Sequence, residues 1–155
     1  MNEIKLNNLD LINLNLKTLT KQDILDYCSI NNLNLNDIIK LYLNDNKLTD
    51  ITGIKLFKNL ISLNLENNEL TDISVLKDLN KLKTLSIGKN KITDISAVQY
   101  LNKLKILSIS NLELPSDQIQ YINGLNNLES LGCYNGFKDM SVLNKLNKNI
   151  KIFRI

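Results

Sequence analysis

The sequence predicts an α/β solenoid, in which successive coils stack a curved parallel sheet on the concave side and short helices on the convex side. The first observation is a repeated word: Thr-Asp-Ile-Ser occurs at 71–74 and again at 93–96, twenty-two residues later. The second is that leucine and asparagine columns recur at the same interval. The third is a change of period within each interval, from the alternation of a strand to the spacing of a helix.

Residues 1–37 are expected to form an N-terminal capping unit of one strand and one helix. The segment "LINLNLKTL" alternates like a strand, with Leu11, Leu14 and Leu16 on its buried side, and "TKQDILDYCSI" is helical in its spacing. Thr20 and Asp23 provide an N-cap and a partner three residues later. An end coil needs a special form because one side of its core has no neighbour. The alternative interpretation is a separate helical interaction motif.

Two apolar columns define the predicted strand of each coil in residues 38–155. In the consensus L-x-x-L-x-L, one residue separates the last two leucines, so both point to one side of a strand and that residue points to the other. We expect the leucine side to face the interior of the solenoid. The first column contains Leu41, Leu63, Leu85, Leu107, Leu131 and Phe153, and the second contains Leu43, Leu65, Ile87, Ile109, Cys133 and Ile155.

Two polar columns follow each strand. The amide of an asparagine carries both a donor and an acceptor, so we expect it to turn inward and satisfy buried backbone groups. A Thr-Asp pair directly precedes the helical spacing, where its oxygens can cap the first free N–H groups of a helix. The asparagine column is Asn46, Asn68 and Asn90, and the aspartate column is Asp50, Asp72 and Asp94.

Two coils depart from the consensus. The unit from 104 to 127 is two residues longer, has Leu112 in place of the asparagine, and restarts at Pro115 as a helix expected to carry Ile119, Ile122 and Leu125 inward. This irregularity is either a recognition bulge or a tolerant loop. The last coil is one residue shorter before its aspartate and ends at "IKIFRI" as an uncapped strand. Such an edge is a candidate site of association.

The repeated columns resemble those of the leucine-rich repeat family, in the 22-residue subtype found in internalins and in the regulatory subunit of protein phosphatase one. The resemblance covers residues 38–155. It implies a noncatalytic module that binds another protein on its concave face. Val75 and Ala97 stand where the family usually has a proline after Asp-Ile-Ser.

The composition argues against an enzyme. There is no histidine to act as a base or metal ligand, and five glycines without a phosphate-binding motif cannot form a phosphate cradle. We therefore expect no catalytic residues, no cofactor, no metal and no small-molecule substrate. Cys28 and Cys133 are expected to be reduced core thiols. The first residues lack the apolar region of a signal peptide, and no apolar run has membrane-span length, so a cytoplasmic location is expected.

Charge is expected to separate between the two edges of the sheet. Asp45, Glu66, Glu69 and Asp72 predict an acidic edge where the strands end, and five lysines predict a basic ridge where they begin. The basic ridge is either a solvated rim or a weak, nonspecific site for nucleic acid, but a net charge of +3 does not indicate a nucleic-acid partner. The five lysines are Lys81, Lys83, Lys103, Lys105 and Lys151.

The concave face is the predicted binding site. Tyr42 and Tyr134 are the predicted anchors, because aromatic side chains on a surface of small residues are typical of protein recognition; Ile152 is also predicted to point outward. The alternative is a passive concave face, with self-association as a homodimer, or pairing with a partner, through the C-terminal strand edge. The predicted contact residues are Lys40, Tyr42, Asn44, Asn64, Glu66, Ser86, Ser108, Tyr134 and Arg154.

Overall fold

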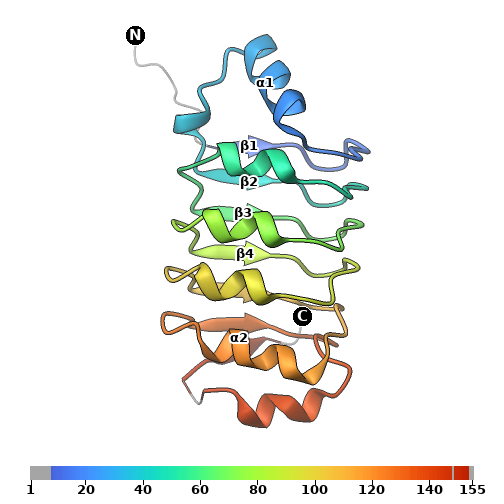
Figure 1. The fold of residues 1–155 in the computed structure, drawn as a ribbon, viewed down its shortest axis with the longest axis vertical. Coiled ribbons are helices and arrows are strands. Elements are labelled where there is room, and N and C mark those ends of the chain that lie inside the picture. The colour runs from blue at the N-terminus through green and yellow to red at the C-terminus, as the bar shows by residue number, and fades with distance from the viewer. Residues whose placement is uncertain (1–7, 148, 154–155) are drawn as a thin grey trace.

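The chain forms one sheet of parallel strands with short helices on one side of it (Figure 1). The computed structural model describes residues 8–147 and 149–153, and in this part the strand order follows the chain from β1 to β7. The predicted curved parallel sheet with convex helices is therefore confirmed. The strands are β1 (Asn8–Asp10), β2 (Lys40–Tyr42), β3 (Ser62–Asn64), β4 (Thr84–Ser86), β5 (Ile106–Ser108), β6 (Ser130–Gly132) and β7 (Lys151–Phe153).

The central residue of each strand from β2 to β6 is a buried leucine, and its two neighbours point out of the opposite face. Leu41 pairs in register with Leu63, and the same column continues through Leu85, Leu107 and Leu131. All five leucines are at most 1% exposed. The interior and the concave face were therefore predicted correctly for these five strands.

The convex side of the regular coils carries 3₁₀ helices rather than α-helices. The aspartates cap them as predicted: Asp50 Oδ1 accepts from the N–H of Thr52 at 2.7 Å, and Asp72 and Asp94 make the equivalent bond at the same distance. Thr49, which precedes Asp50, has another role, since its Oγ1 donates to the carbonyl of Lys17. The 3₁₀ helices are Leu35–Asp37, Thr52–Leu56, Ser74–Asp78, Ser96–Tyr100, Ser116–Gln118 and Met140–Lys145.

The asparagine column forms a ladder that joins each coil to the one before it. Asn68 Nδ2 donates to the carbonyl of Leu65 in its own coil and to that of Leu43 in the preceding coil, both at 3.0 Å. Its Oδ1 accepts from the N–H of Leu48 at 3.0 Å. Asn46 and Asn90 repeat this arrangement. The prediction that these amides satisfy buried backbone is confirmed.

The first coil contains the predicted helix but not the predicted strand. Helix α1 (Lys21–Ile30) begins after Thr20, whose side chain and that of Asp23 form a reciprocal capping box. The strand, however, is Asn8–Asp10, with Leu9 paired with Leu41, so the strand predicted from Leu11, Leu14 and Leu16 is wrong. The backbone of Asn13 and Asn15 takes positive φ angles and turns the chain there. Leu14 is consequently 55% exposed.

The packing of α1 against the second coil requires a glycine. A Cβ on Gly53 would lie 2.4 Å from the carbonyl oxygen of Thr20, the residue that caps α1. Gly53 N–H also donates to the carbonyl of Leu19 at 2.8 Å. The backbones of the two coils thus meet directly at this position. The role of residues 1–37 as a capping unit stays a prediction.

The longer coil folds as predicted. Helix α2 (Ile119–Asn123) follows the 3₁₀ turn Ser116–Gln118, and Ile119, Ile122 and Leu125 are at most 6% exposed. Gln118 is also buried, and its Oε1 accepts from the N–H of Ile95 in the preceding coil at 2.9 Å. A glutamine therefore connects these two coils on the convex side.

The last strand is shifted by one residue from its predicted register. Ile152, not Phe153, pairs with Leu131, and Phe153 pairs with Gly132. A shift of one residue exchanges the two faces of a strand. Ile152 was therefore wrongly predicted to point outward, and Phe153 was wrongly predicted to back the core. Arg154 and Ile155 lie outside the described residues.

Candidate functional site

The outward side chains of the strands form rows across the concave face. The row at the strand ends becomes small toward the C-terminal half and is then closed by an aromatic residue. In register it reads Asp10, Tyr42, Asn64, Ser86, Ser108, Gly132 and Phe153. Large side chains thus stand on both sides of a stretch of serine and glycine.

A hollow of about 620 Å³ lies over this small stretch. Three apolar side chains on its walls are exposed to solvent: Ile106 by 44%, Tyr134 by 50% and Phe153 by 43%. Ser108 and Gly132 lie between them on adjacent strands, and a Cβ on Gly132 would already be 3.2 Å from Ser108 Oγ. The hollow therefore depends on the absence of a side chain at Gly132.

The two aromatic residues are held by backbone hydrogen bonds between coils. Tyr134 N–H donates to Ser110 Oγ at 3.2 Å, and its carbonyl accepts from the N–H of Asn111 at 2.6 Å. The residue before it, Cys133, donates its N–H to the carbonyl of Phe153 at 2.9 Å. Both aromatic positions are thus fixed by the stacking of β5, β6 and β7.

The structure brings together four of the predicted contact residues and separates the others. Glu66, Ser86, Ser108 and Tyr134 line the hollow. Those on β2, just after β2 and on β3 lie on the other half of the face, where Tyr42 is half-buried and no aromatic partner lies beside it in the register. This group is Lys40, Tyr42, Asn44 and Asn64. Arg154 lies outside the described residues.

Lys89, Ile106, Gly132 and Phe153 line the hollow but are not among the predicted contact residues. Ile106 and Gly132 nevertheless occupy outward strand positions that the repeat predicts, and Lys89 lies in the turn after β4. Phe153 was missed because the last strand was counted in the wrong register. The signal that was available is the shortened turn before Asp139.

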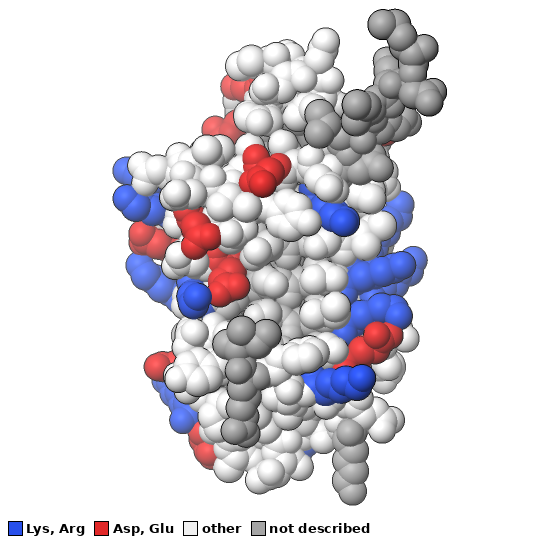
Figure 2. All heavy atoms as spheres, turned by 180° about the vertical axis from the view of Figure 1, so that it is seen from behind, with Lys and Arg blue, Asp and Glu red and all other residues white. Residues whose placement is uncertain are grey.

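The edge at the strand ends is ion-paired rather than acidic, which corrects the predicted charge separation. Lys89 Nζ lies 3.1 Å from Glu66 Oε1, and Lys91 Nζ lies 2.9 Å from Glu69 Oε2. The hydrogen bond from Lys91 holds the pKa of Glu69 below its usual value. Figure 2 shows basic and acidic side chains mixed along this edge, while basic side chains predominate along the other.

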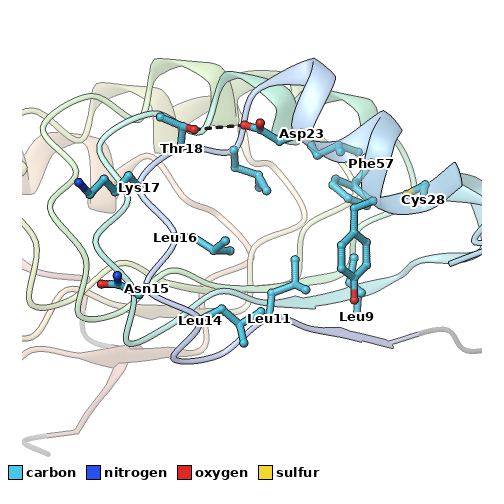
Figure 3. Close-up of a pocket in the computed structure, with 13 residues that line it drawn as sticks. Leu9, Leu11, Leu14, Asn15, Leu16, Lys17, Thr18, Asp23, Cys28 and Phe57 are labelled. Carbon is cyan, nitrogen blue, oxygen red and sulfur yellow. Dashed lines mark hydrogen bonds between the residues drawn. The ribbon is translucent and has the colours of Figure 1, made fainter. Parts of the chain in front are cut away.

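A second cavity of about 340 Å³ lies beneath α1 at the N-terminal end (Figure 3). Its walls are largely apolar, and Figure 3 shows Leu16 and Phe57 at the cavity, with Asn15 and Lys17 at its far end. Cys28 is 7% exposed there, and burial raises the pKa of its thiol. A buried, protonated thiol is a weak nucleophile, so Cys28 does not make this cavity a reactive site. We interpret the cavity as a gap in the packing of the first coil.

Metal-binding clusters and membrane-spanning helices are both absent from the described part of the chain. Across residues 8–147 and 149–153, no three or more His, Cys, Asp or Glu side chains gather closely enough to hold a metal ion. None of the helices in these residues is long and apolar enough to cross a bilayer. The hollow itself contains one carboxylate, that of Glu66, and it is paired with Lys89.

Comparison with known proteins identifies the repeats. Residues 37–78 and 58–100 match the family model described as leucine rich repeats in two copies. The chain is similar to the crystal structure of the internalin inlF of Listeria monocytogenes, with 32% identity and a TM-score of 0.68, over 77% of this chain and 35% of that one. Internalin C2 of the same organism, at 24% identity, shares the fold with a TM-score of 0.57 over 96% of this chain and 74% of that one.

The chain is a leucine-rich repeat protein that resembles the internalins. It spans about a third of the length of inlF. No curated protein sequence matches it. The leucine-rich repeat fold is typical of protein-interaction modules, which use the extended surface of the stacked coils.

Proposed function

We propose that this chain is a noncatalytic module that binds another protein on its concave face, and that the hollow between Tyr134 and Phe153 is the centre of the contact. The observation that carries the proposal is the exposure of two aromatic side chains, 50% and 43%, beside a floor of serine and glycine. Protein interfaces concentrate their binding energy in such aromatic positions.

The dimensions of the face suit a polypeptide better than a metabolite. Strands lie about 4.8 Å apart, so seven of them extend over about 30 Å, which accommodates an interface of standard size. The hollow is a shallow depression in this wall, with Ile106, Tyr134 and Phe153 contributed by three different coils. Apolar side chains of a partner protein would enter it while the rest of the face contacts the flanking backbone.

The ion pair at the rim gives the hollow one polar side. Glu66 and Lys89 both line it, and their side chains are 32% and 54% exposed. An exposed ion pair of this kind contributes about 0.2–1 kcal/mol to the stability of the chain, and charged groups at the rim of an interface mainly set the orientation of the partner. Tyr42 extends the proposed contact toward the N-terminal half.

The test is affinity capture from cells of the source organism, with quantitative mass spectrometry of the retained proteins. The baits are the unmodified chain, the double variant Tyr134→Ser with Phe153→Ser, and the matched control Tyr100→Ser. Tyr100 is 54% exposed but lies at the end of a convex 3₁₀ helix. We expect one protein to be retained by the unmodified chain and by the control but lost by the double variant.

The outcome depends on the fold being intact, so circular dichroism and the unfolding midpoint of each bait are measured first. If the folded double variant retains every protein that the unmodified chain retains, the concave hollow is not the binding site. Fractionation of the source cells is a separate measurement that tests the expected cytoplasmic location of the chain.

A second candidate is pairing at the outer edge of β7, either with another copy of the chain or with a partner protein. Within the described residues β7 has a strand neighbour on one side, β6, and its core-facing Ile152 is still 39% exposed. Such an edge can accept another strand. Sedimentation velocity over a wide concentration range tests it: a monomer at every concentration argues against self-association, and a partner still captured by Ile152→Lys argues against edge pairing.

A further inference from the structure

We infer that the partner presents an acidic segment to this chain, with carboxylates along the lysine edge and an apolar side chain in the hollow. The lysine edge is defined as Lys81, Lys83, Lys103 and Lys105, which lie just before β4 and β5. This inference rests on the proposed function, because it names the chemistry of the polypeptide that the concave face would bind.

Backbone hydrogen bonds place these lysines side by side on neighbouring coils. Lys105 N–H donates to the carbonyl of Lys83 at 2.9 Å, and Glu129 N–H donates to the carbonyl of Lys105 at the same distance. Lys81 Nζ reaches Asn59 Oδ1 of the preceding coil at 2.7 Å. Equivalent positions are therefore separated by about one strand spacing, roughly 4.8 Å. The four lysines form a continuous strip.

The strip has more positive than negative charge. Lys105 forms an ion pair with Glu129 at 2.6 Å, but Lys81, Lys83 and Lys103 make none within the residues that the structure describes. All four are exposed. At the opposite edge, by contrast, Lys89 and Lys91 are each matched by a glutamate. Lys17 and Lys47 lie near Glu69 at that opposite edge, so positive charge predominates only along the lysine edge, as Figure 2 shows.

The lysine edge adjoins the hollow. Lys105 directly precedes Ile106, which begins β5 and forms one wall of the hollow. A polypeptide that places an apolar side chain between Ile106 and Tyr134 would therefore cross the lysine strip with its next residues. Glutamate or aspartate at those residues matches the positive strip, whereas lysine or arginine would be repelled.

A protein segment fits this arrangement better than single-stranded nucleic acid does. A phosphate chain would need basic groups along its whole path, but Glu66 lines the hollow and Glu69 and Asp45 lie at the far edge. The carboxyls of Asp45 and Glu69 have lowered pKa values, because Asn67 and Lys91 respectively donate hydrogen bonds to them, so both are charged at neutral pH. An acidic polypeptide needs positive charge only where its own carboxylates lie.

The experiment selects binders from a phage-displayed library of random twelve-residue peptides, using the unmodified chain as bait. Each selected peptide is then synthesised, and its affinity is measured by fluorescence anisotropy for three further variants. The first is Lys83→Glu with Lys103→Glu. The second, with the same change of charge on the convex 3₁₀ helices, is Lys55→Glu with Lys77→Glu. The third is the double variant Tyr134→Ser with Phe153→Ser.

We expect the selected peptides to carry net negative charge and one large apolar residue. Their affinity should fall by about tenfold or more for the Lys83 and Lys103 variant and by less than about twofold for the convex control. Raising the salt concentration should lower the affinity of the unmodified chain for the peptides toward that of the Lys83 and Lys103 variant, since exposed charges are screened.

Four results would overturn the inference. Neutral or basic peptides that lose affinity for the Tyr134 and Phe153 variant would leave the proposed function intact but remove its acidic partner. Peptides affected equally by both charge reversals would show a general charge effect. Binding of a twenty-residue oligouridine that exceeds that of every peptide and depends on Lys83 and Lys103 would assign the strip to nucleic acid. A selection in which no peptide depends on the hollow would refute both proposals.

Discussion

Replacing Asn68 by alanine tests whether the asparagine ladder holds the coils together. Asn68 is 7% exposed and makes three hydrogen bonds of 3.0 Å to backbone groups of two coils. The carbonyls of Leu43 and Leu65 each keep another amide donor, from Asn46 and Asn90 respectively. The N–H of Leu48 has only Asn68 Oδ1 as its acceptor among the bonds found, so the variant leaves it buried and unsatisfied.

The expected cost follows from these bonds. One orphaned buried N–H costs about 1–3 kcal/mol, and two weakened carbonyl contacts add a few tenths each. We therefore expect Asn68→Ala to lower the free energy of unfolding by about 2–3 kcal/mol. With a urea m-value of about 2 kcal/mol/M, the midpoint of unfolding falls by about 1–1.5 M.

The assay is urea unfolding followed by circular dichroism, with Asn80→Ala as the matched control. Asn80 is exposed in a turn, and its replacement should change the unfolding free energy by no more than about 0.5 kcal/mol. Equal midpoints for the two variants would refute the claim that the ladder amides satisfy buried backbone.

The shared carbonyls extend this prediction to pairs of variants. Asn46 and Asn68 both donate to Leu43 O, so replacing both leaves that carbonyl without either amide, and the combined cost should exceed the sum by about 1 kcal/mol. Asn46 and Asn90 share no acceptor, and their costs should add within about 0.5 kcal/mol. Costs that also add strictly for Asn46 with Asn68 would contradict the shared hydrogen bonds of the ladder.

Three further predictions concern the first coils and α2. Gly53→Ala forces a Cβ within 2.4 Å of Thr20 O and should lower the melting temperature, whereas Gly124→Ala, with its nearest contact at 3.5 Å, should leave it unchanged or higher. The N–H of Thr20 donates to Asp23 and holds the pKa of that carboxyl below its usual value of about 3.9. The stabilisation from this cap is therefore complete above the usual pKa and is lost as the pH falls through the lower pKa of the folded state. Asp23→Asn should consequently flatten the decline of the urea midpoint in acid. Because burial raises the pKa of Cys28, iodoacetamide at pH 8 should label Cys28 at least about tenfold more slowly in the folded chain than in the urea-unfolded chain, as measured by mass spectrometry of the peptide that contains it.

The sequence could predict the regular coils because each column has one physical role. Leu63 is buried, Asn68 joins two coils and Asp72 caps a 3₁₀ turn, and all three roles repeat at the same interval. The type of the convex helices was less predictable, since they are 3₁₀ helices of five residues in the regular coils. A spacing of apolar residues over so short a segment does not distinguish the two kinds of helix.

The first coil could not be placed from its leucines alone. Leucines occur at 9, 11, 14 and 16, so two strand registers fit the same segment. Pairing with β2 selects Leu9 and Leu11, and the positive φ of Asn13 matches that of Asp45 and Asn67 in the next coils. The tertiary contact therefore decides between two local patterns of nearly equal quality.

The last coil shows where counting must restart. From Asp50 to Leu63 and from Asp72 to Leu85 the chain advances by the same number of residues as from Asp139 to Ile152. The shortening lies earlier, at Gly136, where a Cβ would be 2.5 Å from Cys133 Sγ. Counting from Asp139 would have placed Ile152 inward and Phe153 on the concave face.

The candidate site lies at outward positions, where packing of the interior restricts the choice of residue least. The buried columns need apolar side chains or a ladder asparagine for the coils to stack, but the outward positions at Ser86, Ser108 and Gly132 are free of that requirement. Solubility alone would be met by charges spread over both edges, yet basic side chains predominate along one edge, as Figure 2 shows, and the exposed aromatic residues lie beside the same coils. A partner that presents an apolar side chain next to carboxylates accounts for both features together, whereas stacking of the repeats accounts for neither.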